Sequence, residues 1–224
     1  MRIHNKGLLT VILGGSRSGK SAFAEDYLVK KAQRTGGRLV YIASGTATDA
    51  EMQARIDQHR LDRAHINWTT LEQSVRMEEV LPSIRLGDLV LWDCATTWLA
   101  NELYEGWDEG TPCIHQPGCM EAKEERLYET VEALRQKAAH LIIVSNEVLD
   151  DIPMSDPETK IYMKWLGRVH RELVRRADEA IEMDYGVAMY WKRGRNDEWT
   201  NGRRDGIRFG EDDDLHSTLP HPRQ

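Results

Sequence analysis

Residues 14–21 of this chain read Gly-Gly-Ser-Arg-Ser-Gly-Lys-Ser, which fits the phosphate-binding pattern G-x-x-x-x-G-K-[S/T]. The octapeptide stands between a short apolar run at residues 8–13 and a segment in which apolar residues recur at helical spacing. In that setting the backbone N–H groups of the loop and the positive end of the following helix converge on one concavity. The motif therefore predicts a strand–loop–helix unit that binds a nucleoside triphosphate.

The motif also assigns tasks to particular side chains. We expect Lys20 to reach the β- and γ-phosphates and to act in catalysis, and the hydroxyl of Ser21 to ligate Mg²⁺. Magnesium must be held from a second direction, and Asp93, which closes the apolar run at residues 89–92, is the candidate. Asp93 has an alternative interpretation as the N-cap of the next helix, and Glu147 is a weaker candidate ligand. The nucleotide-binding residues of the loop are Gly14, Gly15, Ser16, Arg17, Ser18, Gly19, Lys20 and Ser21.

Strand and helix patterns alternate along the chain. Apolar runs predict strands at residues 8–13, 38–43, 88–93, 140–144 and 187–191. Helical spacing predicts helices at residues 20–34, 49–63, 121–138 and 158–177, and another through Leu99 and Leu103. This alternation favours an α/β fold of the P-loop NTPase (RecA-like) class, with a mainly parallel sheet covered by helices on both faces.

The length favours one domain with a tail. We expect a P-loop domain at residues 1–192, with a Gly- and Pro-rich insertion at about 106–120. Residues 193–224 mix Gly, Arg and Asp with little periodicity, which predicts a charged, disordered tail.

Composition excludes several classes of protein. The chain has 224 residues, 40% of them hydrophobic and 30% charged, with a formal net charge of −7. This charge argues against nucleic acid as a partner, because binding to a phosphate backbone needs a basic face. No run approaches the roughly 20 apolar residues that span a bilayer, so we expect no membrane span and a cytoplasmic location.

The cysteines number three, Cys94, Cys113 and Cys119. An odd and sparse set does not suggest a disulfide framework, and a reducing compartment fits best. Two thiols and His115 could bind zinc, but a structural zinc site needs four ligands and no fourth lies nearby in sequence. We favour a flexible loop there.

Four stretches together match one family: the loop at 14–21, residues 41–44 followed by 49–60, residues 91–101, and residues 144–148. In these positions the chain resembles the bifunctional adenosylcobinamide kinase and adenosylcobinamide-phosphate guanylyltransferase of cobalamin biosynthesis. The most specific stretch is Arg55-Ile56-x-x-His59-Arg60, which ordinary P-loop kinases lack.

The resemblance implies two reactions on one scaffold. ATP or GTP would phosphorylate the aminopropanol hydroxyl of adenosylcobinamide, and GMP from GTP would then be joined to that phosphate, with release of pyrophosphate. It also implies that His59 attacks the α-phosphate to give a guanylyl-histidine, chemistry that suits a neutral imidazole. From spacing alone, however, Met52, Ile56 and His59 could form an ordinary core-facing helical stripe.

By the same matching, further positions are expected to contact the guanine nucleotide. Arginines at 55, 60 and 63 would stabilise charge that grows on the phosphate oxygens. The resemblance also implies small-molecule substrates only and a homotrimer. The implied nucleotide contacts are Ser44, Gly45, Thr46, Arg60, Leu61, Asp62, Arg63, Glu72 and Asp93.

The chain departs from the family pattern after residue 148. The turn reads Leu-Asp-Asp-Ile-Pro at 149–153, an expected Arg-Asp pair is absent at 160–164, and His170 stands where the family has asparagine. Three interpretations stay open: a divergent bifunctional enzyme or one that keeps a single activity, a P-loop small-molecule kinase with a different acceptor, and a nucleotide-dependent switch without catalysis.

Overall fold

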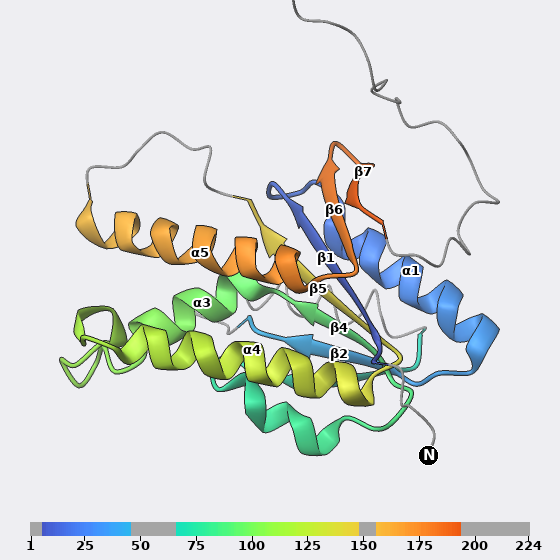
Figure 1. Cartoon of the computed structure of the whole chain (residues 1–224), viewed down its shortest axis with the longest axis horizontal. Helices are drawn as coiled ribbons and strands as arrows, with labels where there is room; N and C mark the ends of the chain where they lie inside the picture. Colours follow the sequence, from blue (N-terminus) through green and yellow to red (C-terminus); the bar gives the residue numbers. More distant parts are fainter. Residues whose placement is uncertain (1–5, 46–65, 148–155, 194–224) are drawn as a thin grey trace, which may run out of the picture. The chain divides into compact units, whose positions relative to one another are not determined.

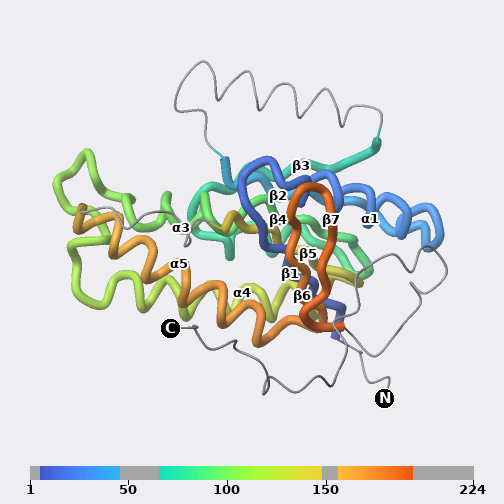
Figure 2. The backbone as a smooth tube through the Cα atoms, turned by 90° about the horizontal axis from the view of Figure 1, so that it is seen from above, coloured from blue at the N-terminus to red at the C-terminus, as the bar shows by residue number. Residues whose placement is uncertain are grey.

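A computed structural model describes residues 6–45, 66–147 and 156–193. Its helices and strands alternate as the sequence predicts, and Figures 1 and 2 show their arrangement. In chain order the elements are β1 Leu8–Gly14, α1 Lys20–Thr35, β2 Leu39–Ala43, β3 Trp68–Glu72, η1 Met77–Ser83, β4 Leu89–Asp93, α3 Ala95–Tyr104, η2 Cys113–His115, α4 Cys119–Lys137, β5 His140–Asn146, α5 Pro157–Arg176, β6 Glu179–Asp184 and β7 Val187–Lys192.

The strands form one seven-stranded sheet in the order β3-β2-β4-β5-β1-β6-β7. Every pairing is parallel except that between β6 and β7, which form an antiparallel hairpin. The carboxyl ends of the parallel strands therefore lie along one edge of the sheet, where α/β proteins bind their ligands. Because β5 lies between β1 and β4, the P-loop after β1 and Asp93 at the end of β4 are two strands apart on that edge.

Helices cover both faces of the sheet (Figure 1). On one face, Ala24 and Leu28 of α1 pack with inward-facing residues such as Ile12. On the other face, α3, α4 and α5 bury a larger cluster that includes Trp98 and Leu166. The strands are apolar on both sides because both of their faces are covered, and the predicted fold class is confirmed.

Two strands were not predicted from the sequence. β3 reads Trp-Thr-Thr-Leu-Glu and is half exposed at one edge of the sheet, so it lacks the apolar run of a central strand. β6 reads Glu-Ala-Ile-Glu-Met-Asp, and its acidic residues obscure the apolar pattern. Two of these carboxylates have partners: Glu179 accepts from Thr10 and Glu182 from Trp191.

The segment between α3 and α4 contains a disulfide. Cys113 and Cys119 are bonded to each other, with their Cα atoms 5.6 Å apart. The expectation that the cysteines stay unpaired is therefore wrong for these two, while Cys94 is free and buried. Both thiols are used in the bond, which removes the interpretation of this segment as a zinc site. The described residues contain no group of three or more His, Cys, Asp and Glu side chains that could hold a metal ion. The two cysteines are six positions apart in the chain, a spacing that gives no pairing signal in sequence.

Several predicted features lie outside the described residues: the helix at 49–63 with His59, the turn at 149–153, and residues 194–224. Within the described ranges no helix is both long and apolar enough to cross a membrane.

Candidate functional site

The P-loop turns sharply from β1 into α1. Gly14 is required here, because a Cβ at this position would lie 2.4 Å from the carbonyl oxygen of Met183 on β6. Gly19 caps α1 with φ 91°, a left-handed conformation that favours glycine. The backbone of Ser18 donates to Gly15 O at 3.2 Å and closes the turn, which leaves Gly15, Ser16 and Arg17 exposed at the sheet edge. The loop therefore presents its N–H groups and the start of α1 to the same space, as a phosphate site requires.

Lys20 is buried at the base of this loop. Its Nζ donates to Gly15 O at 3.1 Å, and the residue is 6% exposed. Burial lowers the pKa of Lys20 from its ordinary value, and the nearby Asp93 carboxylate partly opposes this shift. A cation that is partly stripped of water and adjacent to the loop is well placed to pair with phosphate oxygens.

Asp93 ends β4 with its side chain half-buried. Tyr41 Oη donates to Asp93 Oδ2 at 2.8 Å. The Asp93 carboxylate is close enough to Lys20 of the P-loop to raise the pKa of that lysine by charge attraction. The N-cap of α3 is Cys94, with no side-chain cap hydrogen bond, so the interpretation of Asp93 as a helix cap is wrong. The assignment of Asp93 and the Ser21 hydroxyl as ligands of Mg²⁺ stays a prediction.

Ser44 has all of its polar groups engaged. Its N–H donates to Asp93 O at 2.9 Å, its carbonyl accepts from Asn101 Nδ2 at 2.9 Å, and its hydroxyl accepts from Trp92 Nε1 at 2.7 Å. The same Asn101 amide donates to Ser74 O at 3.1 Å. Asn101 therefore ties the end of β2 to the loop after β3. Gly45, just after β2, and Glu72, at the end of β3, are exposed.

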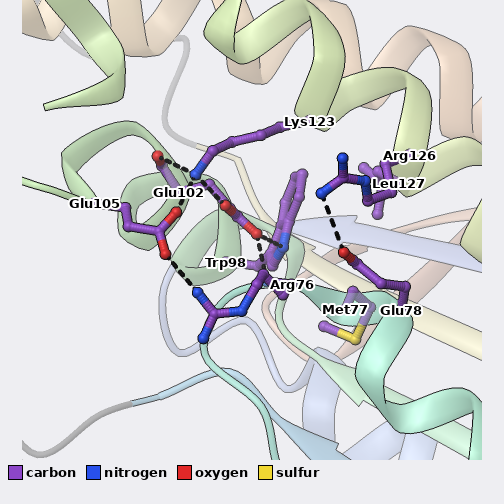
Figure 3. A pocket seen from close by; sticks show the side chains of 9 residues that line it. All are labelled: Arg76, Met77, Glu78, Trp98, Glu102, Glu105, Lys123, Arg126 and Leu127. Carbon is purple, nitrogen blue, oxygen red and sulfur yellow. Dashed lines mark hydrogen bonds and ion pairs between the residues drawn. The ribbon is translucent and has the colours of Figure 1, made fainter.

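The loop after β3 is held by a network of charged residues at a small pocket of about 90 Å³ (Figure 3). Glu102 of α3 is 2% exposed and accepts from the backbone N–H of Arg76 at 2.6 Å and from Trp98 Nε1 at 3.0 Å. Lys123 of α4 pairs with Glu102 and Glu105, both at 2.5 Å. Every buried charge in this network has a partner, so the pocket is best interpreted as a support for the loop.

A chain of hydroxyl and imidazole groups lies behind the end of β5. Thr96 Oγ1 accepts from the Asn146 backbone at 2.5 Å and lies 2.6 Å from Ser145 Oγ, which lies 2.7 Å from His170 Nε2. Burial lowers the pKa of His170 to about 4, so the imidazole is neutral near pH 7. His170 Nδ1 lies 3.8 Å from Glu147 Oε2, and the Glu147 backbone donates to Gly14 O at 2.8 Å. The chain thus joins α5 to the P-loop edge.

The structure brings the described part of the expected site to one edge of the sheet. The P-loop follows β1, and Asp93 and Glu72 both pair in register with Ala43 at the ends of their strands. Thr46, His59 and residues 60–63 lie outside the described residues. Neither Tyr41 nor Asn101 has a role predicted from the sequence, although both stand in the stretches that carry the family resemblance.

A P-loop between β1 and α1, with an acidic residue at the end of a strand two positions away, defines a nucleotide-dependent α/β enzyme of the P-loop class. Comparison with known proteins then narrows the class. Residues 10–190 match the family model "Cobinamide kinase / cobinamide phosphate guanyltransferase", and the chain belongs to this family.

Curated relatives agree with this assignment. The chain is 33% identical over 182 residues to the bifunctional adenosylcobalamin biosynthesis protein CobP of Pseudomonas aeruginosa, in a match covering 80% of this chain and 94% of that protein. It is 29% identical over 184 residues to the bifunctional adenosylcobalamin biosynthesis protein CobU of Escherichia coli, covering 81% and 98% of the two chains. The CobU of Salmonella typhimurium is also 29% identical over 184 residues.

Proposed function

We propose that this protein is a bifunctional enzyme that phosphorylates adenosylcobinamide and then joins GMP to the product. In the first reaction the substrate hydroxyl attacks the γ-phosphorus of ATP or GTP, the bond to the bridging oxygen breaks, and a nucleoside diphosphate leaves. In the second, His59 attacks the α-phosphorus of GTP and pyrophosphate leaves. The phosphate of the first product then displaces His59 and gives adenosylcobinamide-GDP.

The observation that carries this proposal is the conjunction of the P-loop with Asp93 on a chain that matches the family from residue 10 to 190. Lys20 would pair with phosphate oxygens in both reactions, since either the γ-phosphate or the leaving pyrophosphate carries growing charge. Mg²⁺ bound by Ser21 and Asp93 would supply further neutralisation. Tyr41 would hold the Asp93 carboxylate in place, because it donates to one carboxylate oxygen.

We assign the guanine side of the site to the ends of β2 and β3. The exposed Gly45 and Glu72 can contact a nucleotide directly, together with Thr46, Arg60, Leu61, Asp62 and Arg63 as the resemblance implies. Ser44 would act by shaping this strand end, because its N–H, carbonyl and hydroxyl are already bonded.

The proposal extends to the domain boundaries, the location and the assembly of the protein. We place the catalytic domain at residues 1–192, followed by a charged tail at 193–224; the family match over residues 10–190 supports the domain. A cytoplasmic location fits the use of nucleoside triphosphates, and we expect a homotrimer from the resemblance. Sedimentation of the purified protein would test the assembly.

A different acceptor is the second candidate, and His170 favours it. The family asparagine at this position is replaced by a buried imidazole bonded to Ser145 beside the P-loop edge. This change would alter the surroundings of the acceptor and leave the phosphate site intact.

The test is covalent labelling with GTP that carries radioactive phosphorus at the α-position. We expect an acid-labile label on the wild-type protein and none on His59→Ala. GTP labelled at the γ-position should instead label adenosylcobinamide. A protein that transfers γ-phosphate without retaining α-label would be a kinase only, and undiminished label in His59→Ala would exclude this histidine as the nucleophile.

A further inference from the structure

The turn between β6 and β7 lies against the P-loop. Gly186 donates its backbone N–H to Ser18 O at 3.1 Å, and a Cβ placed on Gly19 would lie 3.7 Å from Gly186 Cα. The two elements are neighbours because β6 pairs with β1, the strand that leads into the loop. Figure 2 shows the β6–β7 hairpin beside this end of β1. The position of the turn is therefore fixed relative to the phosphate-binding loop.

The turn carries an unusual residue. Asp184 pairs with Val187, so Tyr185 and Gly186 are the two central residues, and their φ angles of 45° and 80° are both positive. Such two-residue turns strongly prefer Asn-Gly or Asp-Gly, since a bulky side chain is strained in the left-handed region. Tyr185 is nevertheless present, and its side chain is 94% exposed. A residue with a strained backbone and a solvated ring contributes nothing to this fold that asparagine would not supply at lower cost.

We propose that Tyr185 is the platform on which the base of the phosphoryl donor stacks during the kinase step. The inference rests on the proposed function, because it presupposes a triphosphate in the P-loop. Aromatic side chains bind nucleobases through their flat faces, and the interaction tolerates any base. A tyrosine one residue from a backbone contact with the phosphate loop has the reach and the chemistry for this role.

Sheet order separates this platform from the guanine side of the site. Ser44 and Glu72 lie at the ends of β2 and β3, on one flank of the P-loop, and Tyr185 lies beyond β6 on the opposite flank. A triphosphate with its base at Tyr185 directs its γ-phosphate toward the Asp93 side. A triphosphate with its base near Glu72 instead brings its α-phosphate to the Asp93 side of the P-loop. The two reactions would therefore use two base subsites with one shared phosphate loop.

This arrangement has a consequence for specificity. Stacking on Tyr185 offers no hydrogen-bond readout, so the kinase step should accept ATP and GTP alike. The guanine side carries polar groups such as the Glu72 carboxylate, which can accept from the amino and imino groups of guanine. Selection for GTP should therefore appear only in guanylyl transfer.

The experiment compares the binding of ATP and of inorganic tripolyphosphate to the full-length protein by calorimetry. Tyr185→Asn removes the ring and gives the turn its preferred residue, so folding is not at risk, whereas Tyr185→Phe keeps the ring. Trp191→Ala is the matched control, because this indole is also exposed on the hairpin but lies at the far end of β7. Thermal unfolding would confirm that the variants are folded.

We expect Tyr185→Asn to weaken ATP binding about fivefold or more, the lower end of what loss of one stacked aromatic costs. Its tripolyphosphate affinity should stay within about twofold of wild type, and Tyr185→Phe and Trp191→Ala should bind both ligands normally. Unchanged ATP binding in Tyr185→Asn, or an equal loss for tripolyphosphate, would overturn the assignment. If the wild-type protein binds neither ATP nor tripolyphosphate, the proposed function of the P-loop is wrong, a result that differs from a loss confined to Tyr185→Asn.

Discussion

Tyr41 donates a hydrogen bond of 2.8 Å to Oδ2 of Asp93, which fixes one oxygen of the carboxylate that we assign to Mg²⁺. Tyr41→Phe should weaken this positioning and raise the Mg²⁺ concentration for half-maximal activity about tenfold, since one hydrogen bond to a charged group is worth at least roughly 1.5 kcal/mol. Activity measured over a magnesium titration would show the effect. Tyr128→Phe is the control, because Tyr128 donates to Glu124 on α4. An unchanged magnesium requirement in Tyr41→Phe would contradict the role.

Lys20 should be required for both reactions. Lys20→Met removes the only cation of the phosphate-binding motif that the fold buries, and we expect each rate to fall by about 100-fold or more. Stability should not fall, because burial already disfavours the charged side chain, as its lowered pKa indicates. Steady-state rates and thermal unfolding would test both statements. Lys30→Met, on the exposed side of the same helix, should be normal, and a variant Lys20→Met with normal rates would exclude the P-loop as the site.

Much of the fold was predictable because its signals are local. The central strands are continuous apolar runs, and the glycines of the P-loop mark the turn into α1. The edge strand β3 and the acidic strand β6 were missed, because their sequences are polar and their pairing is set by neighbours distant in the chain.

The supporting contacts of the site were not predictable from sequence. Tyr41 is opposite Leu91 in the sheet and so reaches Asp93 only diagonally, a relation that depends on strand register. Asn101 joins Ser44 to Ser74 across two loops. Neither contact produces a recognisable pattern in the sequence. Asp93 and the P-loop residues, in contrast, could be predicted, because a phosphate-binding motif requires them.

Stability should depend on pH through His140, which lies at the amino end of β5, away from the P-loop. Lys31 donates to His140 Nδ1 at 3.0 Å, so Nε2 carries the proton and donates to Thr10 Oγ1 at 2.8 Å. Burial lowers the pKa of His140 to about 3, below its ordinary value of 6.5. Between pH 6.5 and about 3, His140 is therefore protonated in the unfolded chain but not in the folded protein. The free energy of unfolding decreases as pH falls through this range.

The expected slope is up to about 1.4 kcal/mol per pH unit for this residue. Denaturant unfolding at several pH values would measure it. His140→Gln keeps an acceptor and a donor and should reduce the slope, whereas His115→Gln, at an exposed histidine, should not. Equal slopes in wild type and His140→Gln would contradict the assignment.

Reduction of the Cys113–Cys119 disulfide should affect stability more than catalysis. The bond closes a short loop between α3 and α4, and the chain-entropy relation gives about 2 kcal/mol for a loop of this size. We expect Cys113→Ser and the reduced wild type to lose a similar free energy of unfolding, measured with and without a thiol reductant. Nucleotide binding should be unchanged, because neither cysteine is among the residues that we assign to nucleotide binding. A large loss of nucleotide affinity on reduction would show that this loop contributes to the site.

In the proposed mechanism one P-loop serves attack at two different phosphorus atoms of a triphosphate. The most direct measurement follows adenosylcobinamide by mass spectrometry in the presence of GTP and Mg²⁺. We expect adenosylcobinamide phosphate first and adenosylcobinamide-GDP second in wild type, the phosphate alone in His59→Ala, and neither product in Lys20→Met. Formation of the GDP product by His59→Ala, or binding of GTP by wild type with no change in the cobinamide, would contradict it.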